Sequence, residues 1–154
     1  MLEIGSFEGG SAVWFLCNIL SHPTARLVCI DPFFDPRREI RFEHNVLLTG
    51  ARDKVCKLRG VSELIAPGLE TESFDLIYVD GAHRAPNVML DAMVSWELLR
   101  PGGVLVFDDY EWKPRRPAGH RPQLAIELFL KSHAGKYCLV HKGYQVAVRK
   151  KPKD

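Results

Sequence analysis

The sequence has no long apolar run and little excess of either charge. No stretch approaches the ~18 consecutive apolar residues that a membrane-spanning helix needs, and the first residues lack the basic region and apolar core of a secretory signal. The formal net charge of +2 is too small to indicate a nucleic-acid or membrane-surface partner. We therefore expect a soluble, cytoplasmic protein that binds neither nucleic acid nor a membrane.

Cysteine is also scarce, and its spacing excludes the common cysteine-rich designs. The four cysteines, Cys17, Cys29, Cys56 and Cys138, include no Cys-x-x-Cys pair, so neither a disulfide framework nor a zinc site is predicted. Three of them fall within apolar helix or strand patterns, and we expect buried free thiols. With 154 residues, 46% hydrophobic and 26% charged, residues 1–154 are expected to form a single domain.

Residues 1–11 (MLEIGSFEGGS) have the pattern of an apolar strand, a glycine turn and the start of a helix. Gly5 and Gly9 allow a sharp turn and close approach of a ligand, and a helix beginning at Gly10 presents free N–H groups. A dinucleotide-binding fingerprint would have glycine where Phe7 stands, which disfavours a nicotinamide-dependent oxidoreductase. On the glycines alone, an ordinary turn and a ligand-binding turn remain equally open.

The segment Glu-Ile-Gly-Ser-Phe-Glu-Gly-Gly-Ser at residues 3–11 resembles the first motif of class I S-adenosylmethionine-dependent methyltransferases, such as catechol O-methyltransferase. Glu3 favours a ligand site, because a carboxylate on a buried strand needs a cationic or hydrogen-bonding partner. In the resembling enzymes this glutamate faces the amino group of the methionine part of the cofactor. The resemblance implies a cofactor site that includes Glu3, Gly5, Ser6, Gly9 and Ser11.

A βαβ unit is predicted next. The apolar residues Val13, Leu16, Cys17 and Leu20 recur at helical spacing, and residues 26–30 form a short apolar strand that stops at Asp31. Such a unit is right-handed and places its ligand crevice at the carboxyl ends of the strands. Asp31 is therefore a candidate for binding ribose hydroxyls, and the alternative is a turn aspartate before proline.

The middle of the chain contains a predicted helix at 37–48, a strand at 55–59 and a short helix within 60–67. The last of these resembles the stretch that lines the adenine in the same enzymes. Ser62 and Glu63 are therefore adenine-side candidates. A compatible alternative is an N-cap serine followed by a first-turn glutamate.

Two apolar strands end on acidic residues. Residues 76–79 lead to Asp80, and residues 104–107 lead to Asp108 and Asp109. Since neighbouring parallel strands end at one edge of a sheet, we expect these three carboxylates to converge, and oxygen ligands of this kind suit magnesium, manganese or calcium. The helix between the strands is predicted to pack through Met89, Ala92, Met93, Trp96 and Leu99, and to be closed by residues 100–103.

The resemblance sharpens this prediction. Catechol and caffeoyl-coenzyme-A O-methyltransferases hold magnesium with an aspartate after the fourth strand and an Asp-Asn pair after the fifth. The resemblance therefore implies Asp80, Asp108 and Asp109 as metal ligands, with Asp109 in place of the asparagine. A structural role in turns at the sheet edge is the alternative. His83 stands where the catechol enzyme has a proton-accepting lysine, so His83 or Asp80 is the candidate catalytic base, while His83 could equally be a surface histidine. Asp80 is also counted among the cofactor-binding residues.

The C-terminal third begins with a proline-rich basic segment, residues 111–122, which we expect to be either a substrate lid or a solvated loop. A helix follows with Leu124, Ala125, Leu128 and Phe129. Residues 137–141 and 144–148, joined by Lys142-Gly143, predict a β-hairpin. Residues 149–154 are expected to be a frayed end.

Together these features predict an α/β, Rossmann-like three-layer sandwich with a mostly parallel seven-stranded sheet, order 3-2-1-4-5-7-6, and a C-terminal antiparallel hairpin. The resemblance implies O-methylation of a small-molecule hydroxyl with S-adenosylmethionine, and the acidic cluster adds Mg²⁺ or another divalent cation as a candidate cofactor. Alternatives are a metal-independent small-molecule methyltransferase and a non-catalytic cofactor-binding module. The family's helices before the first strand have no counterpart in the sequence, so a homodimer could cover the exposed face.

Overall fold

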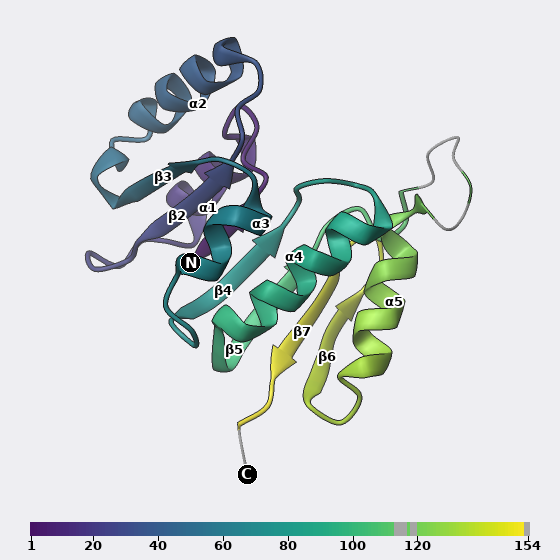
Figure 1. Ribbon diagram of the computed structural model, residues 1–154. Coiled ribbons are helices and arrows are strands. Elements are labelled where there is room, and N and C mark those ends of the chain that lie inside the picture. Colours follow the sequence, from purple (N-terminus) through teal and green to yellow (C-terminus); the bar gives the residue numbers. More distant parts are fainter. Residues whose placement is uncertain (113–116, 118–119, 153–154) are drawn as a thin grey trace.

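The computed structural model describes residues 1–112, 117 and 120–152. Its centre is one seven-stranded sheet in the order β3-β2-β1-β4-β5-β7-β6, as predicted (Figure 1). The first five strands run parallel, and β7 runs antiparallel to both β5 and β6. The strands are β1 (Leu2–Ile4), β2 (Leu27–Asp31), β3 (Val55–Arg59), β4 (Phe74–Val79), β5 (Leu99–Phe107), β6 (Tyr137–Lys142) and β7 (Val146–Lys150).

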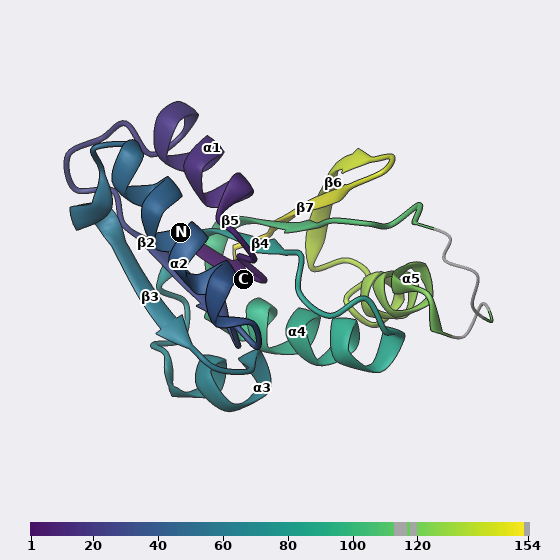
Figure 2. The ribbon, with the colours of Figure 1, turned by 90° about the horizontal axis from the view of Figure 1, so that it is seen from above.

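Helices lie on both faces of this sheet, which makes the predicted three layers. Figure 2 shows α1 and α2 on one face and α3, α4 and α5 on the other. The helices are α1 (Gly10–Asn18), α2 (Pro36–Leu48), α3 (Ser62–Ile65), α4 (Ala85–Leu98) and α5 (Pro122–Ser132), and two short 3-10 turns span Arg52–Lys54 and Ala66–Gly68.

Each face of the sheet has its own apolar core. Phe107 and Phe129 are fully buried under α4 and α5, and their rings meet edge to face. On the opposite face Phe33, which follows β2, and Phe42 of α2 are buried in a second cluster. Burial on both faces explains why the parallel strands have nearly continuous apolar sequences instead of alternating ones.

The packing faces of the helices differ in part from the predictions. In α4 the buried residues are Ala85, Val88, Asp91, Ala92, Ser95, Trp96 and Leu98. Met93, which was predicted to pack inward, is 45% exposed. The prediction was wrong because Asp91 and Ser95 are polar but point inward. The spacing of apolar residues in the sequence therefore did not identify the buried face of α4.

A smaller error of the same kind affects α1. The buried residues of α1 are Ala12, Phe15 and Leu16, with Cys17 exposed. The predicted helix is present as α5, in which Leu124 and Leu128 are exposed, while the buried residues are Pro122, Ala125, Ile126, Phe129 and Leu130. All four cysteines are free, as predicted, but only Cys29 is buried. Because long apolar residues lie on both sides of these helices, their spacing in the sequence does not show which face is buried.

The strands near the C-terminus also begin and end elsewhere than predicted. Strand β5 starts at Leu99, directly after α4, so residues 100–103 lie within the strand and do not form a separate turn. The predicted hairpin is present, but β7 spans Val146–Lys150, two residues later than expected. The end of the chain is therefore not frayed from residue 149.

Lys150 is the clearest sign of this ordered end. Only 7% of the residue is exposed, and its ammonium donates hydrogen bonds to the carbonyl oxygens of Trp96 (2.8 Å) and Leu99 (2.7 Å). It also lies 5.1 Å from the centre of the Trp96 ring. A cation at the C-terminal end of a helix satisfies carbonyl groups that have no partner within the helix. Lys150 thus joins the last strand to the end of α4.

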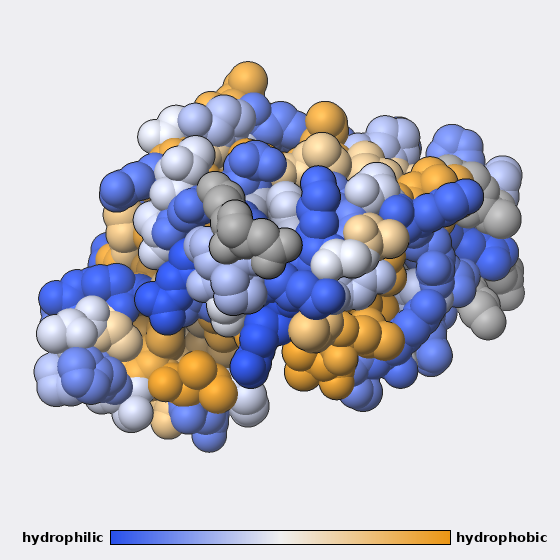
Figure 3. Space-filling model, turned by 90° about the horizontal axis from the view of Figure 1, so that it is seen from below, coloured by the Kyte–Doolittle hydropathy of each residue, from blue (hydrophilic) through white to orange (hydrophobic). Residues whose placement is uncertain are grey.

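The surface carries apolar side chains as well. Figure 3 shows orange patches separated by polar side chains on the side seen from below. Trp14 and Leu139 are each 54% exposed. In Figure 2 no helix of the described residues lies over β5, β7 and β6 on the side that carries α1.

Two further predictions concern the segment before α5 and the absence of a membrane-spanning helix. The proposed lid includes Lys113–Arg116 and Ala118–Gly119, which lie outside them, as do residues 153–154. Among residues 1–112, 117 and 120–152, no helix is both long enough and apolar enough to cross a membrane.

We predict that Lys150→Met lowers the free energy of unfolding by about 2 kcal/mol, because two buried carbonyl groups lose their donor. Urea denaturation followed by circular dichroism measures this loss. Lys151→Met is the matched control, since Lys151 is exposed and its side chain has none of these contacts. Equal midpoints for the two variants would contradict the capping role of Lys150.

Candidate active site

A cavity of about 890 Å³ opens at the carboxyl ends of β1, β2 and β4. Parallel pairing of β1 with both neighbours brings distant parts of the sequence together at this edge. Most of the residues predicted to bind a cofactor or to do chemistry line the cavity: Gly5, Ser6, Ser11, Asp31, Ser62, Glu63, Asp80, His83, Asp108 and Asp109. Glu3 and Gly9 are not among its lining residues.

The glycine turn after β1 has the backbone that its sequence suggests. Gly5 has φ +89°, and a Cβ built there would overlap the carbonyl of Asp80. Gly5 therefore permits β1 and the end of β4 to approach each other closely. Phe7 also adopts a left-handed backbone, with φ 48°, at the position where a dinucleotide fingerprint has glycine. Phe7 thus has the left-handed backbone that glycine usually adopts, although it carries a large side chain.

Asp31 stabilises this turn. One carboxylate oxygen accepts hydrogen bonds from the backbone N–H groups of Ser6 (3.0 Å) and Phe7 (2.9 Å), and the other accepts from Phe33 N–H (2.7 Å). The predicted alternative, a turn aspartate, is therefore part of its role. A carboxylate has about four acceptor positions, so these bonds leave room for ribose hydroxyls, and that role stays a prediction.

Glu3 lies behind the turn and is fully buried. Its Oε2 accepts a hydrogen bond from the Ser6 hydroxyl (2.6 Å), while its Oε1 accepts none from the described residues. Burial raises the pKa of Glu3, although the hydroxyls of Ser11 and Ser6 oppose this shift. A buried carboxylate with one unused oxygen is costly unless a donor or cation reaches it. The predicted contact with an amino group is compatible with this geometry and stays a prediction.

Ser62 and Glu63 form another wall of the cavity. The N-cap of α3 is Val61, so the expected N-cap role of Ser62 is wrong. The Ser62 hydroxyl instead donates to Asp91 Oδ1 at 2.5 Å. Glu63 accepts a hydrogen bond from Asn87 Nδ2 (3.0 Å), which lowers the pKa of Glu63. Both side chains are thus held by residues of α4, which sequence reasoning did not identify.

The three carboxylates predicted as metal ligands, Asp80, Asp108 and Asp109, all line the cavity, and His83 lies among them. Among the described residues, ligand atoms of Asp80, His83 and Asp109 all lie within 4.8 Å of one another. Asp108 lines the cavity but is already engaged, since it accepts hydrogen bonds from the Tyr78 hydroxyl and from Asp109 N–H (2.8 Å). The candidate metal donors that lie closest together are therefore two carboxylates and one imidazole.

His83 lies against both of these carboxylates. Its Nε2 contacts Asp109 Oδ2 and lies 3.7 Å from Asp80 Oδ1. Its ring meets the Trp112 ring edge to face, with 4.9 Å between the centres. The side chain is 38% exposed, so it is both held in place and accessible from the cavity.

Tyr144, from the turn between β6 and β7, completes this group. Its hydroxyl donates to Asp109 Oδ1 (2.6 Å), and this bond raises the pKa of Tyr144 to about 12. Asp109 has a left-handed backbone, with φ 58°, that directs its two oxygens to different partners. The sequence gives no signal for Tyr144 or Tyr78, because only the closed sheet brings them beside the acidic residues.

Asp80 is the most strongly perturbed acid in the cavity. Burial, together with the charges of Asp108 and Asp109, raises the pKa of Asp80 to about 7. A group with such a pKa can hold or release a proton near neutral pH. The cavity therefore contains two groups, His83 and Asp80, suited to moving a proton.

Comparison with known proteins supports the resemblance seen in the sequence. Residues 2–110 match a family model described as a methyltransferase domain. A protein of Acanthamoeba polyphaga mimivirus is 30% identical over 145 residues, which cover 88% of this chain and 62% of that protein. The chain thus spans less than two thirds of the length of this relative.

Solved structures share the fold at lower identity. The O-methyltransferase TomG from Streptomyces achromogenes, involved in tomaymycin synthesis and solved with S-adenosylmethionine, has a TM-score of 0.78 and 23% identity, covering 98% of this chain and 72% of that one. An O-methyltransferase from Bacillus cereus, solved with S-adenosylhomocysteine, has a TM-score of 0.73 and 20% identity, covering 97% and 73%.

The raised pKa of Asp80 leads to a prediction about stability. Between pH ~4, where an unfolded aspartate titrates, and pH ~7, the folded state keeps a proton that the unfolded state has lost, so stability falls as pH rises. We expect Asp80→Asn to match the wild type near pH 4. At pH 8 the variant should be more stable by about 1–2 kcal/mol, a figure reduced for the partial solvation of Asp80.

Urea denaturation at several pH values, with a chelator present, measures this difference. Asp53→Asn is the control, because Asp53 is exposed and far from the cavity. A stability difference between Asp80→Asn and wild type that does not change with pH would show that Asp80 titrates normally.

Proposed function

The chain belongs to the methyltransferase domain family, and from this premise we propose that it is an S-adenosylmethionine-dependent methyltransferase acting on a hydroxyl group of a small molecule. The observation that carries the proposal is that one cavity joins the glycine turn to the proton-accepting edge. Gly5 and Asp31 line one part of it, and Asp80, His83 and Asp109 line another. Binding and proton transfer can therefore take place side by side.

The residues around the turn fit the cofactor. Gly5 lines the cavity where β1 approaches the end of β4, and the N-terminus of α1 faces the same cavity. Asp31 lines the cavity and offers acceptors for hydroxyls, whereas the unused oxygen of Glu3 lies behind the turn and is reached by an ammonium group only if the turn shifts. When bound, S-adenosylmethionine supplies a methyl group on a positively charged sulfur, which a nucleophilic oxygen can displace.

The catalytic contribution of the chain is to align the reactants and to take a proton. We assign His83 as the acceptor of the hydroxyl proton through Nδ1, because its Nε2 contacts the Asp109 carboxylate and therefore carries the N–H of the neutral ring. Asp109 orients the imidazole, and Tyr144 in turn fixes Asp109. Asp80, with its pKa near 7, is the alternative acceptor.

A divalent cation would fit the same edge. Asp80, His83 and Asp109 would hold it, and the cation would lower the pKa of a substrate hydroxyl. One imidazole and two carboxylates suit manganese or zinc better than an all-oxygen magnesium site. The metal-independent form of the reaction, in which His83 acts alone, is favoured by the existing contact between His83 and Asp109.

The choice of a small-molecule hydroxyl rests on likeness to the two O-methyltransferases above, whose folds this chain shares. A cytoplasmic location, a homodimer and a single domain formed by residues 1–154 remain proposals. The uncovered side of β5, β7 and β6 is compatible with a homodimer.

Cofactor binding is tested with a variant that narrows the cavity without disturbing the chain. Gly10 lines the cavity, and a Cβ there would meet nothing within 4 Å. We expect Gly10→Leu to fold normally and to bind S-adenosylhomocysteine at least ~10-fold more weakly in isothermal titration, because its side chain occupies ligand space. Gly68→Leu is the matched control, since a Cβ at this exposed glycine also meets nothing. Equal affinity in both variants, or no binding by the wild type, would refute the proposed cofactor site.

Turnover is tested on a panel of catechols, phenols and sugars with S-adenosylmethionine. We expect His83→Gln to lower kcat by ~10²–10⁴-fold while the affinity for S-adenosylhomocysteine stays unchanged, as loss of a general base does. His44→Gln, on the exposed side of α2, should leave kcat unchanged. Comparison with and without a chelator separates the metal-assisted from the metal-independent reaction. Tight binding without turnover on any member of the panel would instead favour the non-catalytic binding module.

A further inference from the structure

One buried acid in the molecule has no part in the site as described so far. Asp91 lies on α4, is 2% exposed and does not line the cavity. Its Oδ1 accepts the hydrogen bond from the Ser62 hydroxyl at 2.5 Å. A carboxylate buried inside a helix face is costly, so its place behind a cavity wall calls for a physical explanation.

Asp91 supports two walls of the cavity at once. Besides holding Ser62, its Oδ2 lies against Gly81, where an added Cβ would come within 3.2 Å of it. Ser62 and Gly81 both line the cavity. Asp91 therefore fixes the spacing between the turn after β3 and the turn after β4.

The hydrogen bond also fixes the direction of the Ser62 hydroxyl. A hydroxyl has one proton, and an ionised carboxylate can only accept. Burial raises the pKa of Asp91 to about 6, so it is mostly ionised at neutral pH. The nearby Glu63, whose pKa is lowered by Asn87, likewise only accepts when ionised. With its proton committed to Asp91, Ser62 presents lone pairs to the cavity.

From this arrangement we infer that Asp91 is a positioning residue that turns Ser62 into an obligate acceptor, so that this wall selects ligands carrying an N–H donor, such as the 6-amino group of adenine. The inference rests on the proposed function, because it takes the cofactor's base to lie against Ser62. A 6-oxo base offers an acceptor at that position and meets the Ser62 lone pairs without a proton between them.

Two ligands that differ at position 6 of the base, and in the proton that the 6-oxo form carries on N1, provide the test. The change at N1 is the same for every variant, so the difference in preference between variants reports on Ser62. Isothermal titration compares S-adenosylhomocysteine with S-inosylhomocysteine, in which an oxo group replaces the 6-amino group. For the wild type we expect at least ~10-fold preference for the adenosyl ligand, as for other sites that lose a hydrogen-bond partner.

Variants distinguish positioning from simple structural support. In Asp91→Asn the amide can donate to Ser62, which frees the Ser62 proton for an oxo group. The preference should fall below ~3-fold mainly because S-inosylhomocysteine binds more tightly. In Ser62→Ala the preference should also fall, but because S-adenosylhomocysteine binds more weakly.

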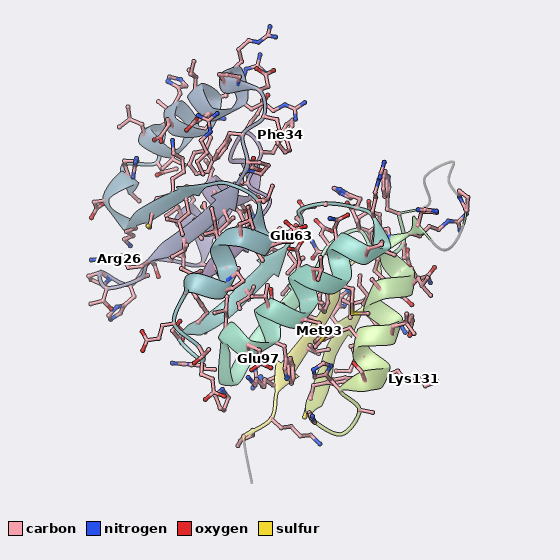
Figure 4. All side chains as sticks on the ribbon, viewed as in Figure 1. Arg26, Phe34, Glu63, Met93, Glu97 and Lys131 are labelled. Atoms are coloured by element: carbon pink, nitrogen blue, oxygen red, sulfur yellow. The ribbon has the colours of Figure 1, made fainter. Side chains whose placement is uncertain are left out.

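Glu97→Gln is the matched control, since it makes the same carboxylate-to-amide change on the same helix. Figure 4 shows Glu97 at the opposite end of the sheet from Glu63, and Glu97 does not line the cavity. Its preference should equal that of the wild type. Circular dichroism melting curves check that each variant is folded.

The outcomes separate the inference from the proposed function. Binding of both ligands with equal affinity by the wild type would overturn the inference and leave the proposed function standing. An unchanged preference in Asp91→Asn would overturn it as well. If Asp91→Asn does not fold, the wild-type preference and its loss in Ser62→Ala decide the matter. Failure of the wild type to bind either ligand would refute the proposed function itself.

Discussion

The close approach of β1 to the end of β4 is the constraint on which the rest of the site depends. Asp80 N–H donates to the carbonyl of Ile4 (2.8 Å), and Gly5 N–H donates to that of Ile30 (2.9 Å), so three strands end at one point. The absence of a side chain at Gly5 makes this possible. Asp31, Asp80 and the N-terminus of α1 thereby face one cavity, although they lie far apart in the sequence.

The order of the sheet could be predicted because its signals are local and repeated. Apolar strands such as residues 76–79, ending on acids or glycines and alternating with helical patterns, leave few arrangements for a right-handed α/β fold. Helix faces were less predictable. Asp91 and Ser95 occupy inward positions of α4, so their polarity conceals the burial that their positions require.

The site was predictable as a set of residues but not as a set of contacts. Sequence position alone placed Asp80, Asp108 and Asp109 at one edge. It could not show that the Tyr78 hydroxyl donates to Asp108, or that Asp109 contacts both His83 and Tyr144. These pairings depend on side-chain direction and on strands that are neighbours only in the folded sheet. Electrostatic repulsion among the acids is thus relieved partly by tyrosine hydroxyls and an imidazole, which donate to them.

The position of β7 has a consequence for how the protein is made. This last strand lies between β5 and β6, and its Lys150 holds the end of α4. During synthesis β5 (Leu99–Phe107) is made well before β7 (Val146–Lys150), so the edge of β5 stays unpaired until β7 follows. Such an edge can pair wrongly with other chains. A nascent chain that has made β5 but not β7 therefore exposes a strand edge that a chaperone can cover.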